Sequence, residues 1–253
     1  MNRLLAIALL CLPLWAQGGV IVGGSQLLGT SDLGTLEHWL GDGSLTLTNI
    51  YSKDPGDIGV DFHAAADNQG PTFSLMRARA GDGSWKLIGG YNPQSWDSSN
   101  GAHYTADPRD WSAFIFNLSD DVLWRQSGPV QTYNRYFDGP TFGAMPLGPD
   151  LGVTADLSQV FSLGGWSYGG AANRGRSIVD GTLDAPNMEL AALEVFTISA
   201  AVVPEPPPAL LLLAGLAALL LSASLRRRPA CGSWPPARHP QRTPGYPSSD
   251  ARR

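Results

Sequence analysis

The segment Gly165–Gly169 matches Gly-x-Ser-x-Gly, the pattern that exposes the nucleophile of many serine hydrolases on a tight turn. That chemistry needs a strand before the serine, a helix after it, and an Asp and then a His further along the chain. The next segment, Gly170–Gly175, is a poor helix former, and no histidine lies between Ser167 and position 203. The pattern therefore favours a glycine-rich strand or turn, with a nucleophilic Ser167 as the alternative.

His63 is a second catalytic candidate, because an imidazole titrates near neutral pH and can act as a general base together with nearby Asp residues. It follows Phe62 in a segment that we expect to form a strand. The alternative is a histidine that is hydrogen-bonded for structural reasons. His38 and His103 are far from it in sequence, and the chain has no His-x-His or His-Glu-x-x-His spacing that would indicate zinc.

Three carboxylates, Asp54, Asp57 and Asp61, lie in a segment that also contains Gly and Pro. Calcium takes oxygen ligands, and carboxylate-rich loops supply them. The spacing does not match a calcium-loop consensus, so a solvated acidic loop is the alternative. We therefore predict no metal or other cofactor, with calcium as the one candidate ion.

Gly89, Gly90 and Tyr91, followed by Ser95 and Trp96, form a further candidate site. Trp and Tyr offer flat apolar faces with a polar group, which suits a shelf for a sugar or a peptide. The structural alternative is that the paired glycines let two backbones approach closely while Trp96 packs at a sheet edge. We favour the structural interpretation.

The elements that must position these residues are mostly strands. The chain is 43% hydrophobic and 15% charged, with 30 Gly and 20 Pro, which is too apolar for a disordered chain and too rich in turn residues for a helical bundle. We expect a mainly β fold, an antiparallel β-sandwich with short flanking helices. The patterns predict a helix over 31–40 and strands over 44–51, 72–78, 85–91, 113–118 and 190–198.

Charge and cysteine usage exclude several classes of function. Residues 17–203 carry nine Lys and Arg against twenty Asp and Glu, a net charge of −11. Phosphate affinity comes mainly from clustered Lys and Arg, so we predict no nucleic-acid partner. The two cysteines, Cys11 and Cys231, lie outside this body, which excludes a disulfide, a Cys nucleophile and a thiolate zinc site within it.

The first residues are typical of a secretory signal peptide, which we assign to 1–18. A basic start at Arg3 is followed by an apolar run over 4–12 and by small residues up to Gly18. We therefore expect the body to be exported.

The segment 203–228 has three parts in a fixed order: Val-Pro-Glu-Pro, an uncharged stretch and an arginine cluster. The uncharged stretch, 209–225, would form a transmembrane helix of roughly 25 Å, and the arginines would stay on the cytoplasmic side. The order resembles the PEP-CTERM sorting signal of Gram-negative bacteria. The signal residues are Val203, Pro204, Glu205, Pro206, Arg226, Arg227 and Arg228.

This resemblance implies a processing partner and a destination. The partner is an exosortase, a membrane-embedded cysteine transpeptidase, which would act near Pro204–Pro206. The precursor would sit in the inner membrane through 209–225 with its body outside the cytoplasm, and the product would reach the cell envelope or the extracellular matrix alongside exopolysaccharide and biofilm material. We expect the tail 229–253, rich in Pro, Ser, Gly and Arg, to be disordered.

A second set of residues occurs in order over roughly 26–199 and resembles the TLD (TLDc) domain of eukaryotic oxidation-resistance proteins. The resemblance implies a β-sandwich flanked by short helices, and protection from oxidative stress or vacuolar ATPase binding in eukaryotes. It brings no agreed catalytic residues, so we expect the set to be structural. The set contains Phe62, His63, Asp67, Gly70, Pro71, Thr72, Gly89, Gly90, Tyr91, Ser95, Trp96, Phe114, Phe116, Pro140, Thr141, Phe142, Gly143, Glu194 and Phe196.

The sequence therefore predicts an exported, exosortase-sorted protein with a non-catalytic binding or structural body. An exopolysaccharide or another matrix component is the expected ligand class. Two alternatives stay open: a secreted enzyme on matrix polymers or oxidants that uses His63, and a calcium-dependent adhesion module.

Overall fold

The computed structural model describes residues 18–143, 148–183 and 187–201, together with Leu212, Gly215, Leu216 and Leu219. The chain divides into two units, Met1–Val203 and Pro204–Arg253, and the fold below belongs to the first. Among the described residues, no helix is long and apolar enough to cross a membrane. The predicted signal peptide up to position 17, most of the predicted helix 209–225, and the arginine cluster and tail lie outside the described residues.

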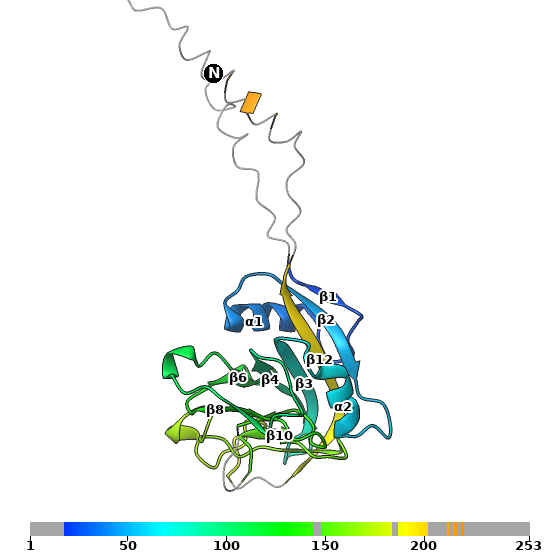
Figure 1. Ribbon diagram of the computed structural model, residues 1–253, viewed down its shortest axis with the longest axis vertical. Helices are drawn as coiled ribbons and strands as arrows, with labels where there is room; N and C mark the ends of the chain where they lie inside the picture. The colour runs from blue at the N-terminus through cyan, green and yellow to red at the C-terminus, as the bar shows by residue number, and fades with distance from the viewer. Residues whose placement is uncertain are drawn as a thin grey trace, which may run out of the picture. The chain divides into compact units, whose positions relative to one another are not determined.

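The body is a single 12-stranded sheet, so the mainly β prediction is confirmed (Figure 1). Its order is β5-β8-β9-β10-β11-β12-β3-β4-β6-β7, with β2 also paired to β12 and β1 paired to β2. All pairings are antiparallel except β1 with β2. The strands are β1 (Val20–Val22), β2 (Leu45–Ser52), β3 (Thr72–Arg79), β4 (Trp85–Asn92), β5 (Ala102–Tyr104), β6 (Phe114–Asn117), β7 (Val122–Arg125), β8 (Val130–Tyr133), β9 (Thr141–Phe142), β10 (Leu151–Val153), β11 (Gln159–Phe161) and β12 (Met188–Ala200).

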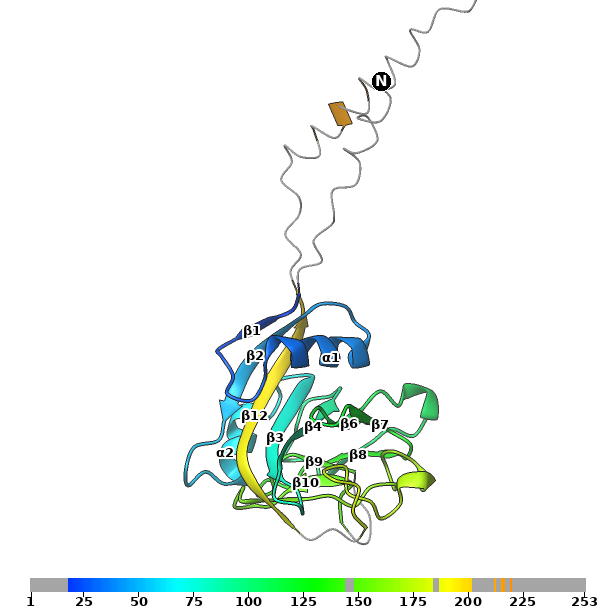
Figure 2. The same cartoon turned by 180° about the vertical axis from the view of Figure 1, so that it is seen from behind.

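The longest strand, β12, joins the two halves of the sheet and runs the length of the body (Figure 2). At about 3.3 Å per residue it spans roughly 40 Å. Its first residues pair with β11, as Met188 does with Val160, and its last residue, Ala200, pairs with Leu45. Register breaks after Leu190 and after Val195 let one strand serve both halves.

The predicted helix over 31–40 is confirmed as α1 (Thr30–Leu40). The carboxylate of Asp32 accepts a hydrogen bond from the backbone N–H of Gly29 at 2.9 Å and so caps the first turn. The apolar side chains Leu33, Leu36 and Trp39 recur at helical spacing and are buried against one face of the sheet.

The strand predicted around Phe62 and His63 is wrong, because this segment forms the helix α2 (Gly59–Ala66). Asp61 accepts a hydrogen bond from the backbone N–H of Ile58 at 2.9 Å, which caps the helix start, and the run of alanines that follows favours helix. Apolar residues in this short segment carry too little periodicity to separate helix from strand. Two single-turn 3-10 helices, Pro108–Asp110 and Ala171–Asn173, complete the described elements.

The two halves of the sheet pack on each other through a close approach at paired glycines. A Cβ added to Gly90 of β4 would lie 2.5 Å from the ring of Phe142 in β9, and one added to Gly89 would lie 2.7 Å from the ring of Phe116 on the other face. Phe142 belongs to the core between the two halves, and Phe116 belongs to the core beneath α1. The missing side chain at Gly90 therefore sets the distance between the two halves of the sheet, and the one at Gly89 leaves room for its cross-strand partner Phe116.

Both described ends of the body emerge together. Val20 pairs with Thr46, and Ala200 pairs with the adjacent Leu45. The strands β8 to β11 lie at the opposite end, where β12 begins (Figures 1 and 2). A body held by either terminus therefore presents β8 to β11 away from the attachment.

Candidate functional site

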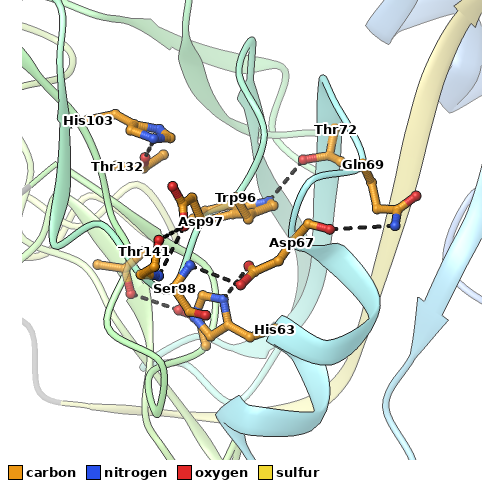
Figure 3. Close-up of polar contacts among 12 residues, drawn as sticks. His63, Asp67, Gln69, Thr72, Trp96, Asp97, Ser98, His103, Thr132 and Thr141 are labelled. Atoms are coloured by element: carbon orange, nitrogen blue, oxygen red, sulfur yellow. Dashed lines mark hydrogen bonds and ion pairs between the residues drawn. The ribbon is translucent and has the colours of Figure 1, made fainter.

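The helix α2 brings His63 and Asp67 together by helical spacing. The imidazole Nδ1 lies 2.7 Å from Asp67 Oδ1, and the other carboxylate oxygen accepts a hydrogen bond from the backbone N–H of Ser98 at 2.9 Å (Figure 3). Residues four apart on a helix share one face, so the pair forms wherever α2 forms. Asp67 thus links the helix to the loop that follows β4.

Burial disfavours the charged form of Asp67, but hydrogen bonds from Ser98 and His63 outweigh burial and hold the pKa of the carboxyl below its usual range. The residue is therefore an anion at neutral pH, and it fixes the orientation of the imidazole. An Asp that orients a His is one part of an acid–base site. However, only 5% of His63 is exposed, so the ring is shielded from a substrate in solution.

The residues that follow Asp67 fasten the same loop from a second side. Gly70 donates its backbone N–H to Ser95 Oγ at 2.8 Å. The indole N–H of Trp96 donates to Thr72 Oγ1 at 2.9 Å (Figure 3). Trp96 is fully buried. These contacts hold segments 67–72 and 95–98 side by side.

An aromatic ladder runs inward from α2 through edge-to-face contacts. Trp96 packs on Phe62 with ring centroids 5.3 Å apart and on Phe142 at 5.5 Å, and Phe142 packs on Tyr168 at 6.3 Å. All four side chains are fully buried. The residues predicted to be structural around Phe62 and Trp96 thus form a continuous part of the core between the two halves of the sheet.

The Gly-x-Ser-x-Gly segment forms a carboxylate-binding turn. The backbone N–H groups of Trp166, Ser167 and Tyr168 all donate to the carboxylate of Asp150, at 3.0 to 3.2 Å. Ser167 is 1% exposed and is followed by a turn and the single 3-10 turn Ala171–Asn173, where a hydrolase would have a full helix. Burial raises the pKa of Asp150 to about 6, although the three N–H donors favour its charged form.

The acidic segment before α2 uses its carboxylates for local hydrogen bonds. Asp57 Oδ2 accepts from the hydroxyl of Tyr51 and from the backbone N–H of Asp54, each at 3.0 Å, while Asp61 caps α2. Within the described part of the chain, no group of three His, Cys, Asp or Glu side chains is placed to hold a metal ion. The prediction that the protein needs no cofactor, and the calcium alternative, stay predictions.

A pocket of about 640 Å³ is lined by residues of β8 to β11 and their loops, away from the described ends of the body at Val20 and Ala200. We call it the β8–β11 pocket. Its wall combines apolar surface with a few charged and polar groups. The lining includes Tyr133, Arg135, Asp138, Thr141, Val153 and Phe161.

The remaining residues of the TLD-like set are spread over the framework. Glu194 is buried in β12 and accepts hydrogen bonds from the Ser25 hydroxyl and the Gln26 backbone N–H, which ties the N-terminal segment to the sheet. Phe73 carries ring contacts with Tyr91, Phe114 and Phe116 beneath α1. The other members lie in and beside β9 from Pro140 to Gly143, at Pro71 before β3, and at Phe196 in β12. The sorting-signal residues lie outside the described ones.

Sequence patterns did not indicate the charged groups of the pocket. Arg135 and Asp138 lie in a loop without a motif, and Phe161 comes from a strand of three residues. Asp150 lies within the segment that resembles the TLD domain, but no local pattern pairs it with the turn 166–168. The available signal for the pocket was the aromatic run Tyr136-Phe137 beside these charges, since two exposed aromatics in a loop are unusual without a ligand.

Comparison with known proteins adds no assignment, because no protein-family model and no curated protein matches this chain.

Proposed function

We propose that this chain is an exported binding protein, whose TLD-like body holds a ligand in the cell envelope or the extracellular matrix without converting it. The topogenic part of the proposal rests on the sequence: the signal peptide 1–18 and the PEP-CTERM-like segment 203–228. An exosortase would process the C-terminal segment.

The observation that carries the binding role is the position of the β8–β11 pocket. Residues of β8 to β11 and their loops line it, and β11 pairs with the first residues of β12, whereas Val20 and Ala200 lie at the other end of β12. A body tethered or delivered through its C-terminal segment would then present the pocket outward. Ligand sites are usually preformed concave pockets, and this one is within the usual range of volume.

The non-catalytic role is supported by what surrounds the two catalytic candidates. His63 and Ser167 are both buried, and neither lines the pocket. Each takes part in a network that fastens one segment of the body to another, through Asp67 in one case and Asp150 in the other.

One observation favours the enzyme alternative. The His63–Asp67 pair has the geometry of an oriented general base. His63 is also near Asp138 of the pocket: burial raises the pKa of the Asp138 carboxyl, and His63 is one of the two groups that partly oppose this rise. Because His63 is only 5% exposed, its neighbours would have to move before a substrate could reach the ring. Turnover of a polysaccharide, peptide or peroxide that His63→Ala abolishes would establish this alternative.

The test of the proposed function is the intact mass of the protein recovered from its native host, measured separately for the envelope and the medium. We expect a species that starts near Gln17 or Gly19 and ends near Pro204 or Glu205. The same material should leave polysaccharides, peptides and peroxide unchanged. A species that keeps both ends would contradict the sorting proposal, and turnover would contradict the non-catalytic role.

A further inference from the structure

We propose that the β8–β11 pocket binds a neutral oligosaccharide. This inference rests on the proposed function, because it names the ligand class of the same binding body. The size of the pocket, its apolar wall, its paired charges and the exposed aromatic residues that follow Arg135 in the chain support this ligand class.

The pocket has the size and the composition of a small-molecule site. Its volume of about 640 Å³ falls inside the roughly 300 to 1,000 Å³ that such sites occupy. Val153 and the ring of Phe161 supply apolar surface, and Thr141 and Tyr133 add hydroxyl groups. A sugar ring has an apolar C–H face and a polar rim, so it needs such a mixture.

Arg135 is held in place by aromatic side chains before any ligand arrives. Its guanidinium carbon lies 4.8 Å from the ring centroid of Tyr133 and 5.8 Å from that of Phe137, and its Nε and Nη2 donate to Tyr133 Oη at 3.1 and 3.0 Å. A planar guanidinium fixed in this way loses little freedom when its N–H groups donate to a ligand. It can reach two neighbouring hydroxyl oxygens with its fork of donors.

Asp138 supplies the opposite type of group. The side chain is half-buried, and burial raises the pKa of its carboxyl against the opposing effect of Arg135 and His63. A half-buried carboxylate is stabilised by a ligand that donates O–H groups to it. A hydroxyl both donates and accepts, so sugar diols satisfy Arg135 and Asp138 together.

The charge balance favours a neutral sugar over an acidic one. Among the described residues that line the pocket, the charged side chains are Arg135 and Asp138, whose opposite charges leave no surplus positive charge to pair with a uronate. The surrounding body carries a net charge of −11 over residues 17–203, which repels polyanions.

Two exposed aromatic side chains supply further apolar surface, more than one sugar ring bound in the pocket would contact. Tyr136 and Phe137 are 61% and 39% exposed and stand edge to face with ring centroids 5.1 Å apart. They lie in the chain between Arg135 and Asp138, which both line the pocket. Aromatic rings at a pocket edge stack on further sugar units, which indicates an oligosaccharide rather than a single sugar.

The experiment is calorimetric titration of the protein as it is recovered from the host envelope, with maltohexaose and cellohexaose as neutral probes. Hexagalacturonate is the acidic control and a Gly-Ser hexapeptide is the peptide control. The variants are Arg135→Ala, whose side chain is exposed and so can be removed without disturbing the core, and Asp138→Asn. Arg174→Ala is the matched control, because Arg174 also stacks on an aromatic ring, at 4.4 Å from Trp166, but does not line the pocket.

We expect at least one neutral hexamer to bind, with Arg135→Ala and Asp138→Asn each weakening the affinity tenfold or more and Arg174→Ala less than twofold. Circular dichroism and a melting curve verify that each variant is folded. Absence of binding to both neutral hexamers, binding only to hexagalacturonate or to the peptide, or equal affinity in all variants would overturn the inference.

Failure of this inference and failure of the proposed function have different signatures. A correctly processed envelope protein that binds no sugar refutes the inference alone. A neutral hexamer that is bound at Arg135 and then cleaved refutes the non-catalytic role but leaves the site in place.

Discussion

The Oδ2 atom of Asp150 lies 3.0 Å from the backbone nitrogen of Ser167, which donates a hydrogen bond to it. The same carboxylate also accepts hydrogen bonds from the backbone N–H groups of Trp166 and Tyr168. Water would accept these hydrogen bonds in a solvent-exposed turn, whereas the buried carboxylate accepts them here. Asp150 lies immediately before β10, whereas the turn lies beyond β11. The contact therefore closes one end of the β8–β11 half of the sheet.

Replacing Asp150 with Ala should destabilise the fold by about 3 kcal/mol or more, because it leaves three N–H donors without their acceptor and each costs roughly 1 to 3 kcal/mol. Asp150→Asn should cost less, since its amide oxygen can still accept from the turn. Urea unfolding at pH 7 measures both values. Equal losses for Ala and Asn would show that the acceptor is not what matters at this position.

Asp150 should also make stability depend on pH. Its pKa of about 6 in the folded state lies above the value of about 3.9 in an unfolded chain, so the folded state binds more protons between these values. The free energy of unfolding of the wild type should therefore fall, relative to Asp150→Asn, by about 2 to 3 kcal/mol as the pH rises from 4 to 6.5. Denaturant titrations at pH 4, 5, 6 and 6.5 test this, and a constant difference between the two proteins would contradict it.

The hydrogen bond between His63 and Asp67 should appear as a coupling energy. His63→Ala and Asp67→Ala each remove one partner, so the double variant should lose less stability than the sum of the two single losses, by about 1 to 2 kcal/mol at pH 7. Thermal or urea unfolding of the four proteins gives the value. Additive losses would mean that the contact at 2.7 Å contributes little to stability.

The lowered pKa of Asp67 predicts sensitivity to acid. Because the folded-state pKa lies below the unfolded value, the carboxylate stabilises the fold above about pH 4, and this stabilisation is lost as the pH falls through the folded-state pKa. The wild type should therefore be more stable than Asp67→Asn at pH 6, and the difference should shrink by pH 3. Melting temperatures of both proteins at the two pH values decide this. A difference that grows on acidification would overturn the assignment.

The close packing at Gly90 should make this position intolerant of a methyl group. A Cβ there would stand 2.5 Å from the buried ring of Phe142, so Gly90→Ala should cost about 1 to 3 kcal/mol through overpacking. Gly101→Ala is the matched control, because a Cβ at Gly101 has no heavy atom within 4 Å. Pairing Gly90→Ala with Phe142→Leu should recover part of the loss measured by urea unfolding. Equal stability of the two glycine variants would show that the two halves of the sheet can move apart freely.

The sequence alone predicted the long, periodic elements. The helix over 31–40 and the strands over 44–51, 72–78 and 85–91 carry their pattern locally, through apolar residues at the spacing of one face. Local patterns wrongly predicted a strand around Phe62, where the cap from Asp61 and the run of alanines stabilise the helix α2. They also failed to find β8 to β11, because strands of two to four residues are too short to show a period.

The candidate functional sites show the same difference between what local sequence indicates and what only the tertiary structure determines. The sequence raised His63 and Trp96 as separate candidates, and only the folded structure brings His63, Asp67 and the segment around Trp96 together. Whether Ser167 is a nucleophile or part of a turn depended on its partner, and Asp150 lies 17 residues before it. The β8–β11 pocket depended wholly on tertiary structure, because strand pairing brings Phe161 beside Arg135 and Asp138 from another part of the chain. Local patterns fix what a segment can form, whereas sites made by distant segments exist only once the sheet has set their register.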